Sequence, residues 1–419
     1  MRTARCMLLI SAVSLLTLLP GRADAQSAFT NAWFGQMRSP APPRTLALGG
    51  LSGVAPWGES PAAIGSPNPA VSALADRVRF ALNWEVGHLG GEYADGEGSL
   101  WQASPRTAGM LAYLGRGLVA GVVLDGLTNS EFEIHSGEGT VGDAEARFDY
   151  MSTGGLNEGR VSLAWRTASG RLLTGLSWNM LFGALDQKWA VQFSDPDYVD
   201  TSDELQRQHR GSSWSAGFQL EPIPSLRIGA VWNSGGALDV KHVYRSSGAE
   251  GDTTRGELEL GDTILAGLGW RFADQWAVYG DYRSTAWDRA AWDPAPGTGG
   301  GITAGPTDLS PLSREWDLGM GIERSGLPAG QQRVWADSLP LRAGVRWGEL
   351  YAPDLDGGSV SQWYLTMGTA FRIGSEEGAL VDLAFQYGGR SGSTGTTEGF
   401  WRLQFGFSGF EQWFQPPQR

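Results

Sequence analysis

The chain has 419 residues, of which 61 are glycine and 19 are tryptophan, and its formal net charge at pH 7 is −13. The aromatic content of 11% excludes an intrinsically disordered chain, and the acidic balance argues against a nucleic-acid partner. Cys6 is the only cysteine, so we predict neither a disulfide nor a cysteine-bound metal. The near-neutral mean hydropathy is typical of membrane barrels, in which lipid-facing and lumen-facing residues alternate.

The first residues have the features of a secretory signal. Arg2 and Arg5 form a basic start, residues 6–19 are mostly apolar, and Ala23-Asp24-Ala25 is a small-residue cleavage site. The apolar run is shorter than the roughly 20 residues of a membrane helix, and no later run reaches that length. We therefore predict that residues 1–25 are a cleaved signal peptide and that the protein is exported.

Residues 26–77 differ from the rest of the chain, because they are rich in proline, alanine, glycine and serine and show no alternation. By composition alone they would be a linker or a tail. Their scattered apolar residues, such as Leu46, Leu48, Val54 and Ile64, indicate that the segment packs against something. Since the strands that follow predict a barrel, we expect residues 26–77 to form a plug inside its lumen.

From residue 78 onward, apolar residues recur with a period of two. Val78, Phe80 and Leu82 alternate with Arg79 and Asn83, and the same pattern returns along the chain, so each segment has one apolar face and one polar or small face. This pattern predicts about fourteen strands, over residues 78–88, 99–114, 117–134, 147–168, 171–192, 211–221, 225–243, 256–272, 275–287, 313–324, 339–349, 360–374, 378–389 and 398–410.

The connections between these strands alternate between short and long, which is typical of a bacterial outer-membrane barrel with periplasmic turns and extracellular loops. Only the connection 325–338 breaks the rule, since it falls on the periplasmic side and is long. We therefore predict an all-β fold, a transmembrane antiparallel barrel over residues 78–414, with the N-terminal plug in its lumen. A soluble sandwich or propeller would also alternate. The glycines and arginines of the polar face, and tryptophans near strand ends such as Trp84 and Trp347, favour the membrane barrel.

Two segments resemble a known family. The sequence Arg44-Thr45-Leu46-Ala47-Leu48-Gly49-Gly50, followed by Ser66-Pro67-Asn68-Pro69-Ala70, resembles the plug of FadL-like outer-membrane transport proteins, and residues 261–287 are similar to that family's mid-barrel hairpin. The resemblance implies that Gly49, Gly50, Asn68, Pro69 and Ala70 anchor the plug.

The resemblance also implies a function. In that family a hydrophobic small molecule, such as a long-chain fatty acid, is captured among extracellular loops and leaves sideways into the membrane when the plug shifts. The expected partners are this ligand, outer-membrane lipid, lipopolysaccharide and the barrel-assembly machinery. A related PorV-like branch shares the plug motif but serves protein secretion, so a secretion component is the alternative. A general diffusion pore is a third possibility.

A side exit in this family lies at a break in the third strand. Here residues 118–124 alternate cleanly, and Asp125 and Gly126 follow. Glycine within a strand often marks a bulge, so these two residues are the candidates for a lateral exit. The alternative is that the strand has reached the outer interface and that Gly126 begins a loop.

Arginines on the predicted inner face, among them Arg79, Arg160, Arg342 and Arg346, are candidates for binding a carboxylate headgroup. The alternative is a structural ladder of ion pairs, because charges in a narrow lumen must be paired or hydrated.

The remaining polar residues predict no enzyme, cofactor or metal centre. The four histidines, His88, His135, His209 and His242, are far apart in sequence, whereas a metal site needs at least three converging ligands. No motif brings a serine nucleophile to a histidine. A run of acids, which we expect to be a solvated loop instead of a calcium site, comprises Asp195, Asp197, Asp200, Asp203 and Glu204.

Overall fold

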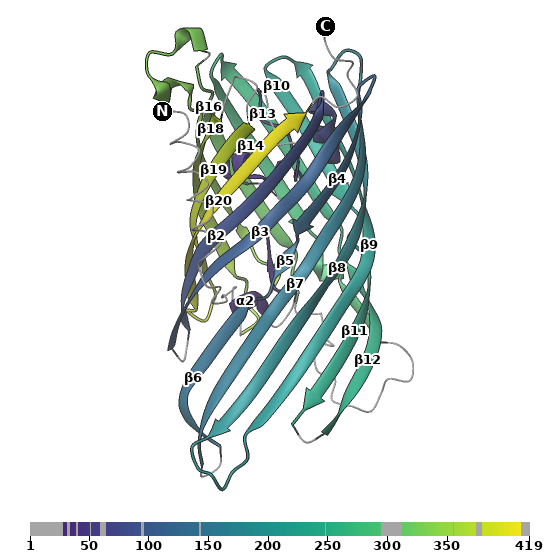
Figure 1. Cartoon of the computed structure of the whole chain (residues 1–419). Coiled ribbons are helices and arrows are strands. Elements are labelled where there is room, and N and C mark those ends of the chain that lie inside the picture. The colour runs from purple at the N-terminus through teal and green to yellow at the C-terminus, as the bar shows by residue number, and fades with distance from the viewer. Residues whose placement is uncertain are drawn as a thin grey trace.

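The chain from Val78 onward forms one closed antiparallel sheet (Figure 1). The computed structural model describes residues 28–31, 34–38, 41–50, 52–58, 64–93, 96–141, 144–247, 249–294, 312–327, 329–354, 356–373 and 379–411. The predicted signal peptide lies outside these residues. No helix in the described part has the length and hydropathy of a membrane span, a finding that does not bear on strands.

The wall of the barrel consists of long strands and strand segments. They are β2 (Val78–Tyr93), β3 (Gly96–Gly115), β4 (Leu118–Gly126), β6 (Phe132–Val141), β7 (Ala144–Arg166), β8 (Leu172–Phe193), β9 (Thr201–Ile223), β10 (Leu226–Asn233), β11 (Gly236–Ser246), β12 (Ala249–Leu260), β13 (Thr263–Ala273), β14 (Trp276–Thr285), β15 (Ala291–Pro294), β16 (Glu315–Arg324), β17 (Leu341–Glu349), β18 (Ser361–Ile373), β19 (Ala379–Ser391) and β20 (Thr397–Glu411).

Four of the strands are interrupted and continue as a second segment: β4 as β6, β10 as β11, β12 as β13, and β14 as β15. β4 and β6 both pair with β7, and β10 and β11 both pair with β9. β12 and β13 pair with β11 and β10 on one side, and with β15 and β14 on the other. With each such pair taken as one strand, the barrel has fourteen strands. The predicted fold class and strand number are therefore confirmed.

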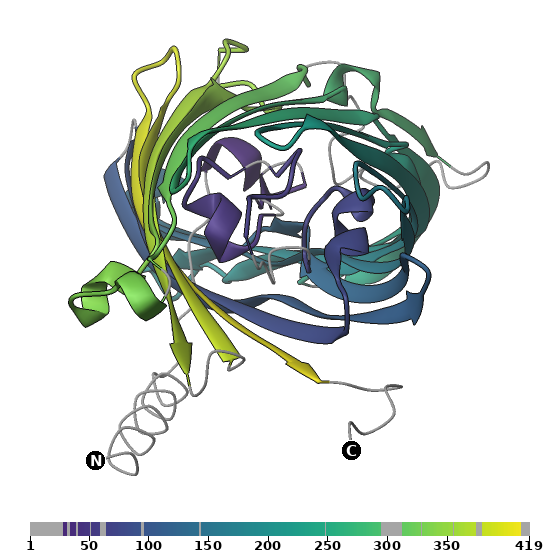
Figure 2. The same cartoon turned by 90° about the horizontal axis from the view of Figure 1, so that it is seen from above.

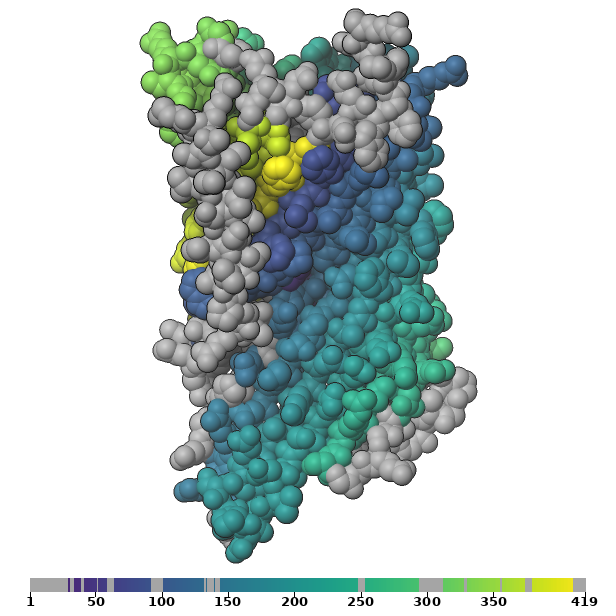
Figure 3. All heavy atoms as spheres, viewed as in Figure 1, coloured from purple at the N-terminus to yellow at the C-terminus, as the bar shows by residue number. Residues whose placement is uncertain are grey.

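Several strands extend further on the long-loop side than the sequence pattern indicated. β9 begins at Thr201, where we expected a loop up to residue 210, and β12 begins at Ala249. Asp203 and Glu204 accordingly lie in β9, so the expectation that they belong to one acidic loop is wrong. Outside the membrane the outer face of a strand meets water instead of lipid. Residues of both faces, such as Gln206 and Arg207, are polar there, so the alternation that marks a membrane strand disappears. Figures 1 and 3 show the result, a wall that is taller at β7, β8, β9, β11 and β12.

The outer surface carries a continuous apolar band. Large hydrophobic side chains on it are half exposed, as with Leu82 at 49% and Leu365 at 50%, which a soluble sandwich or propeller would bury. On β9, Phe218 and Trp214 face outward within this band, and Arg210 faces outward beyond it. The band therefore marks the membrane span, and the wall beyond Trp214 is extracellular.

The N-terminal residues lie inside the ring of strands (Figure 2). They form the short helix α3 (Pro43–Leu46) and the 3-10 helix η2 (Pro69–Leu74), together with α2 (Ala28–Asn31) and β1 (Gln36–Met37). β1 pairs with β5 (Thr128–Asn129), a two-residue strand between β4 and β6. Three further 3-10 helices lie in connections: η3 (Trp287–Arg289), η4 (Ala329–Gln331) and η5 (Trp335–Ser338).

Candidate transport site

Inward-facing glycines allow the N-terminal segment to lie directly against the wall. A methyl group at Gly217 would lie 2.3 Å from Oδ1 of Asn68, and one at Gly344 would lie 2.4 Å from the backbone nitrogen of Gly49. Both distances are shorter than any real contact of such an atom. The wall glycines in the same situation include Gly175, Gly229, Gly321 and Gly368. The small inner face that the sequence pattern showed is therefore the surface on which this segment packs.

Asn68 connects the segment to the wall. Its side chain is fully buried, and its Nδ2 donates to the carbonyl oxygen of Gly53 at 2.8 Å and to that of Phe218, in β9, at 3.1 Å. Its Oδ1 accepts from the amide of Ala70 at 3.0 Å and so caps η2, which begins at Pro69. The wall partner of Asn68 is thus a backbone carbonyl of β9.

Gly49 and Gly50 end the turn that follows α3. Their φ angles of +93° and +87° lie in the left-handed region that favours glycine. The amide of Gly49 donates to Oγ1 of Thr366 at 3.2 Å, and this hydroxyl donates to the carbonyl of Ala47 at 3.1 Å. The two glycines therefore allow a backbone turn that bonds to β18.

A buried ion-pair network joins α3 to the wall. The guanidinium of Arg44 donates to both carboxylate oxygens of Glu323, at 3.1 and 3.0 Å. Arg342 donates to the same carboxylate at 2.9 Å and to Asp382 at 2.8 Å. Two arginines and two acids thus neutralise one another across α3, β16, β17 and β19.

The other arginines proposed for a headgroup also have carboxylate partners. Arg346 binds Asp317 through two hydrogen bonds, at 3.0 and 2.9 Å, and Arg79 lies 3.0 Å from Asp76. Arg160 is 3.2 Å from Glu158, and it also donates to the carbonyl of Ser66 at 2.7 Å. The structure therefore places all four arginines in ion pairs, as the ladder interpretation expects.

The wall is interrupted at Gly126. β4 pairs with β7 up to Gly126 and Asn157, and pairing with β7 resumes in β6 at Phe132 and Ser152. Between these points, Thr128 and its neighbour turn into the lumen as β5 and pair with β1. The strand thus continues beyond Gly126, which is the pattern expected of a break and not of the start of a loop.

The interruption leaves a gap on the other side of this strand. β3 pairs with β4 up to Thr107 and Asp125. Beyond that point, the described pairing of β3 is with β2, and that of β6 is with β7. In the described part of the wall, β3 and β6 are therefore not paired. We call this unpaired stretch of the wall the β3–β6 gap.

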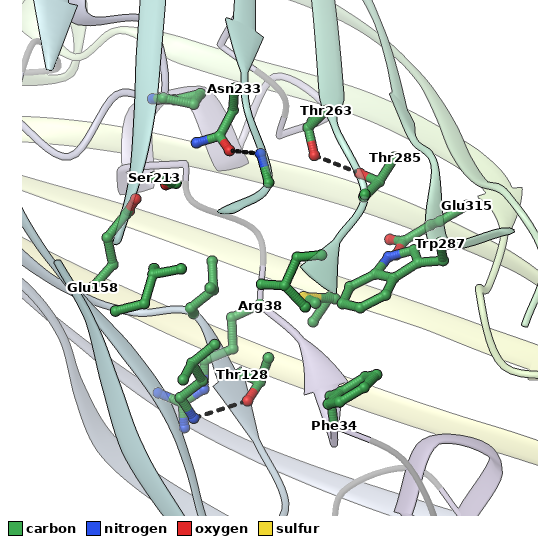
Figure 4. A pocket seen from close by; sticks show the side chains of 18 of the residues that line it. Phe34, Arg38, Thr128, Glu158, Ser213, Asn233, Thr263, Thr285, Trp287 and Glu315 are labelled. Atoms are coloured by element: carbon green, nitrogen blue, oxygen red, sulfur yellow. Dashed lines mark hydrogen bonds between the residues drawn. The ribbon is translucent and has the colours of Figure 1, made fainter. Parts of the chain in front are cut away.

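A cavity of about 150 Å³ lies in the lumen beside this interruption (Figure 4). It is lined mainly by apolar side chains, among them Phe34, Leu127, Leu156, Leu181, Leu238, Leu265 and Trp287. Engineered apolar cavities of about 150 Å³ in other proteins admit benzene. Small polar groups also line the cavity. Among them are the hydroxyls of Thr263 and Thr285, which form a hydrogen bond with each other at 3.0 Å. The site therefore suits a small hydrophobic molecule.

Most charged groups at the cavity are ion-paired. Arg283 lies 2.7 Å from Glu315, and Arg160 pairs with Glu158 as above. Arg38 differs, because in the described structure its guanidinium makes one hydrogen bond, to Oγ of Ser104 in β3 at 3.1 Å, and its buried Nε has no partner there. A methyl group at Gly126 would lie 2.9 Å from its Nη1, so Arg38 connects the cavity with the β3–β6 gap. Sequence analysis missed it, since nothing in its segment alternates.

Three aromatic rings hold β1 from the extracellular side. Phe34 and Trp287 stack with ring centroids 5.3 Å apart, and Trp287 and Tyr351 stack at 4.6 Å. The hydroxyl of Tyr351 donates to the carbonyl of Gly35 at 2.7 Å. These contacts fix the start of the N-terminal segment at the mouth of the cavity.

Two of the histidines, although far apart in sequence, lie close together on the inner face of the extracellular wall. His209 in β9 pairs with Val240, and His242 lies two residues further along β11. The ring of His242 stacks on Trp292 at 5.0 Å. Burial, with the charge of Arg207, lowers the pKa of His209 to about 3 and that of His242 to about 4. Within the described residues no three metal-binding side chains converge.

The fold that this geometry defines is a closed fourteen-stranded barrel with an interrupted third strand and an N-terminal segment in its lumen. The toluene transporter TbuX of Ralstonia pickettii is 14% identical, with a TM-score of 0.57, and the match covers 91% of this chain and 100% of that chain. The toluene transporter TodX of Pseudomonas putida is 14% identical, with a TM-score of 0.56, over 90% of this chain and 99% of that one.

A FadL homologue of Pseudomonas aeruginosa is 12% identical, with a TM-score of 0.57, over 93% of this chain and 99% of that one. No family model and no curated protein match the sequence. The likeness shows that the chain has a barrel fold of the FadL type, as the plug motif and the hairpin had indicated.

Proposed function

We propose that this chain is an outer-membrane transporter of the FadL type, which takes up small hydrophobic molecules passively and is not an enzyme. The observation that carries the proposal is the β3–β6 gap beside an apolar cavity. A ligand that enters this cavity has a lateral path into the bilayer past Asp125 and Gly126. The toluene transporters among the structures with this fold support the same class of ligand.

Residues 26–77 act in this proposal as a plug that blocks passage straight through the lumen. Support comes from the buried contacts of Asn68 with β9 and of Arg44 with β16. A molecule in the cavity would then leave sideways, because the hydrogen-bonded segment stands between it and the periplasm.

The charges favour a neutral ligand over a carboxylate such as that of a long-chain fatty acid. Arg160, Arg342 and Arg346 are already bound to acids in buried pairs, and Arg79 is bound to the exposed Asp76. Removing one partner of a buried pair costs about 3–5 kcal/mol. Among the described residues that line the cavity, Arg38 remains as the candidate contact for an anionic group.

The test is uptake of a matched pair of labelled compounds, a neutral alkylbenzene and a carboxylate of similar size, by cells that lack or express the chain. We expect faster uptake of the neutral compound when the chain is present. Gly126→Val, whose side chain would displace Arg38, should slow this uptake and leave surface binding intact. Uptake of neither compound, with the barrel correctly inserted, would contradict the proposal.

The tall, polar extracellular wall of β7, β8, β9, β11 and β12 favours one second candidate, a component of protein secretion. In that case deletion of the gene would impair export of other proteins and leave uptake of both compounds unchanged.

A further inference from the structure

The connection between β16 and β17 is long although it lies at the end of the barrel where the turns are tight. Elsewhere at this end, β3 and β4 are joined by two residues, Arg116 and Gly117, and β9 and β10 by Pro224 and Ser225. The β16–β17 connection, residues 325–340, instead carries the two 3-10 helices η4 and η5. Neither the cavity nor the β3–β6 gap uses it.

Internal hydrogen bonds hold this connection in one shape. The side chain of Asp337 accepts the backbone amides of Arg333 at 2.8 Å and Val334 at 3.1 Å. The amide of Leu327 donates to the carbonyl of Asp337 at 2.7 Å, and Nε2 of Gln332 donates to the carbonyl of Leu327 at 2.7 Å. The hydrogen bonds from the backbone amides of Arg333 and Val334 favour the carboxylate form and lower the pKa of Asp337.

This ordered connection displays two large apolar side chains. Trp335 is 77% exposed and Val334 is 58% exposed, more than the residues of the lipid-facing band. Exposing such area to water is unfavourable by roughly 25 cal/mol per Å². A fixed turn that holds tryptophan in the open therefore indicates a surface that something covers.

The position of the connection identifies what covers it. Figure 2 shows that it projects outside the ring of strands, over the region that lipid occupies, and not over the lumen. At its base, Ile322 and Leu341 face outward, 38% and 51% exposed, so the connection continues the lipid-facing band. Tryptophan is enriched at the headgroup level of membranes, and the neighbouring exposed Arg333 suits lipid phosphates.

We propose that the β16–β17 connection is a membrane anchor, in which Val334 and Trp335 insert into the phospholipid interface of the periplasmic leaflet. It fixes the barrel's depth and tilt near one side of the periplasmic rim. The proposal rests on the membrane span and not on the ligand, so it stands even if the chain transports something else.

The experiment uses the whole mature protein in vesicles of phosphatidylethanolamine and phosphatidylglycerol. Because Cys6 is the only cysteine and lies in the predicted signal peptide, Ala336→Cys, next to Trp335, gives the mature protein a single site for a spin label. Collision rates with oxygen, which concentrates in lipid, and with a water-soluble nickel complex report the depth of the label. A second label at Gly330→Cys, on the exposed part of η4, serves as the water-facing control.

We expect the label at residue 336 to collide severalfold less with nickel than the label at residue 330, and to collide more with oxygen. Trp335→Ser should bring its nickel collisions up to those of the control, whereas Trp335→Phe should keep them low. Correct insertion is checked for each variant by heat-modifiable gel mobility. Equal nickel access at both positions would overturn the proposal. So would protection of residue 336 from both reagents, which would indicate a protein contact.

Discussion

At the scale of single residues, the side chain of Asn68 contributes most visibly to holding the N-terminal segment in place. Its amide bonds to Gly53 within the N-terminal segment and to Phe218 in the wall, and its oxygen caps η2. Pro69 fixes the backbone at the start of η2 and favours an extended Asn68, whose ψ angle is 105°. One of these three hydrogen bonds joins the segment to the distant wall, and the other two lie within the segment itself.

Asn68→Ala should loosen the segment without unfolding the barrel. The change leaves two buried carbonyls and one amide without their partner, at about 1–3 kcal/mol each. We expect limited proteolysis of inserted protein to cut the N-terminal residues faster, with unchanged heat-modifiable mobility. Asn179→Ala, which removes hydrogen bonds to Ser213 and Ser215 within the wall, is the matched control. A variant that fails to insert would assign Asn68 to assembly instead.

The paired histidines predict a pH dependence in the extracellular wall. His209, with a pKa of about 3, and His242, with a pKa of about 4, bind protons less readily than free imidazole, whose pKa is about 6.5. Between these values an opened wall takes up protons that the closed wall does not. The contribution of the two neutral histidines to the stability of this part of the wall is therefore fully present above about pH 6.5, and it decreases as the pH drops towards 4.

Amide hydrogen exchange in β9 and β11, corrected for its intrinsic pH dependence, should be faster at pH 5 than at pH 7.5. His209→Gln should reduce this difference because it removes one of the two titrating groups. The amides of β17 and β18 in the same protein are the control. Equal changes in both regions would mean that the histidines are not the cause.

At the scale of elements, the inward glycines decide where the N-terminal segment can lie. Gly344→Ala would place a methyl 2.4 Å from the backbone nitrogen of Gly49, whereas a methyl at Gly280 would be 3.9 Å from its nearest neighbour. We expect Gly344→Ala to displace the segment and raise its proteolysis and the channel conductance. Gly280→Ala should leave both unchanged. The same result for the two variants would contradict packing through glycine.

The pairing of β1 with β5 offers a reversible lock. The amide of Arg38 donates to the carbonyl of Leu127, so the adjacent pair Met37 and Thr128 is a non-hydrogen-bonded pair. Such pairs have Cα atoms about 4.5 Å apart, within the range of a disulfide. Met37→Cys with Thr128→Cys should therefore cross-link the N-terminal segment to the interrupted strand.

If ligand passage requires these two strands to separate, the oxidised double variant should take up hydrophobic ligand several times more slowly, and a reductant should restore the rate. Each single cysteine variant is a control for the substitution itself. Unchanged uptake by the fully oxidised protein would show that the pairing persists during transport.

At the scale of the whole molecule, the N-terminal segment lies in the lumen and belongs to no strand of the barrel wall. The fourteen strands close without it, so we expect the barrel to insert when it is shortened. Deletion of residues 30–70, with the signal retained, should raise single-channel conductance in planar bilayers, because it removes the buried contacts of Arg44, Gly49 and Asn68. Conductance equal to that of the full chain would remove the case for a plug.

The sequence by itself determined the class of the barrel, because lipid on one side of a strand and a crowded lumen on the other impose alternation on neighbouring residues. Leu341, Val345 and Trp347 show this pattern without any knowledge of their partners. It also contained the turn at Gly49 and the Asn68-Pro69 motif, since these depend on local backbone geometry. It also made Gly126 a candidate for a break, because glycine is a local signal, but it did not distinguish a break from the start of a loop.

Only the tertiary structure decided what depends on distant segments meeting. Closure of the barrel places His209 beside His242, brings Arg38 to Gly126, and sets each inward glycine against a particular residue of the N-terminal segment. The length of the extracellular wall was also beyond the sequence pattern, because at the start of β9 the outer face meets water instead of lipid and is as polar as the inner face. There β9 is stabilised by backbone hydrogen bonds to β8 and β11, which produce no periodic pattern in the sequence of one strand.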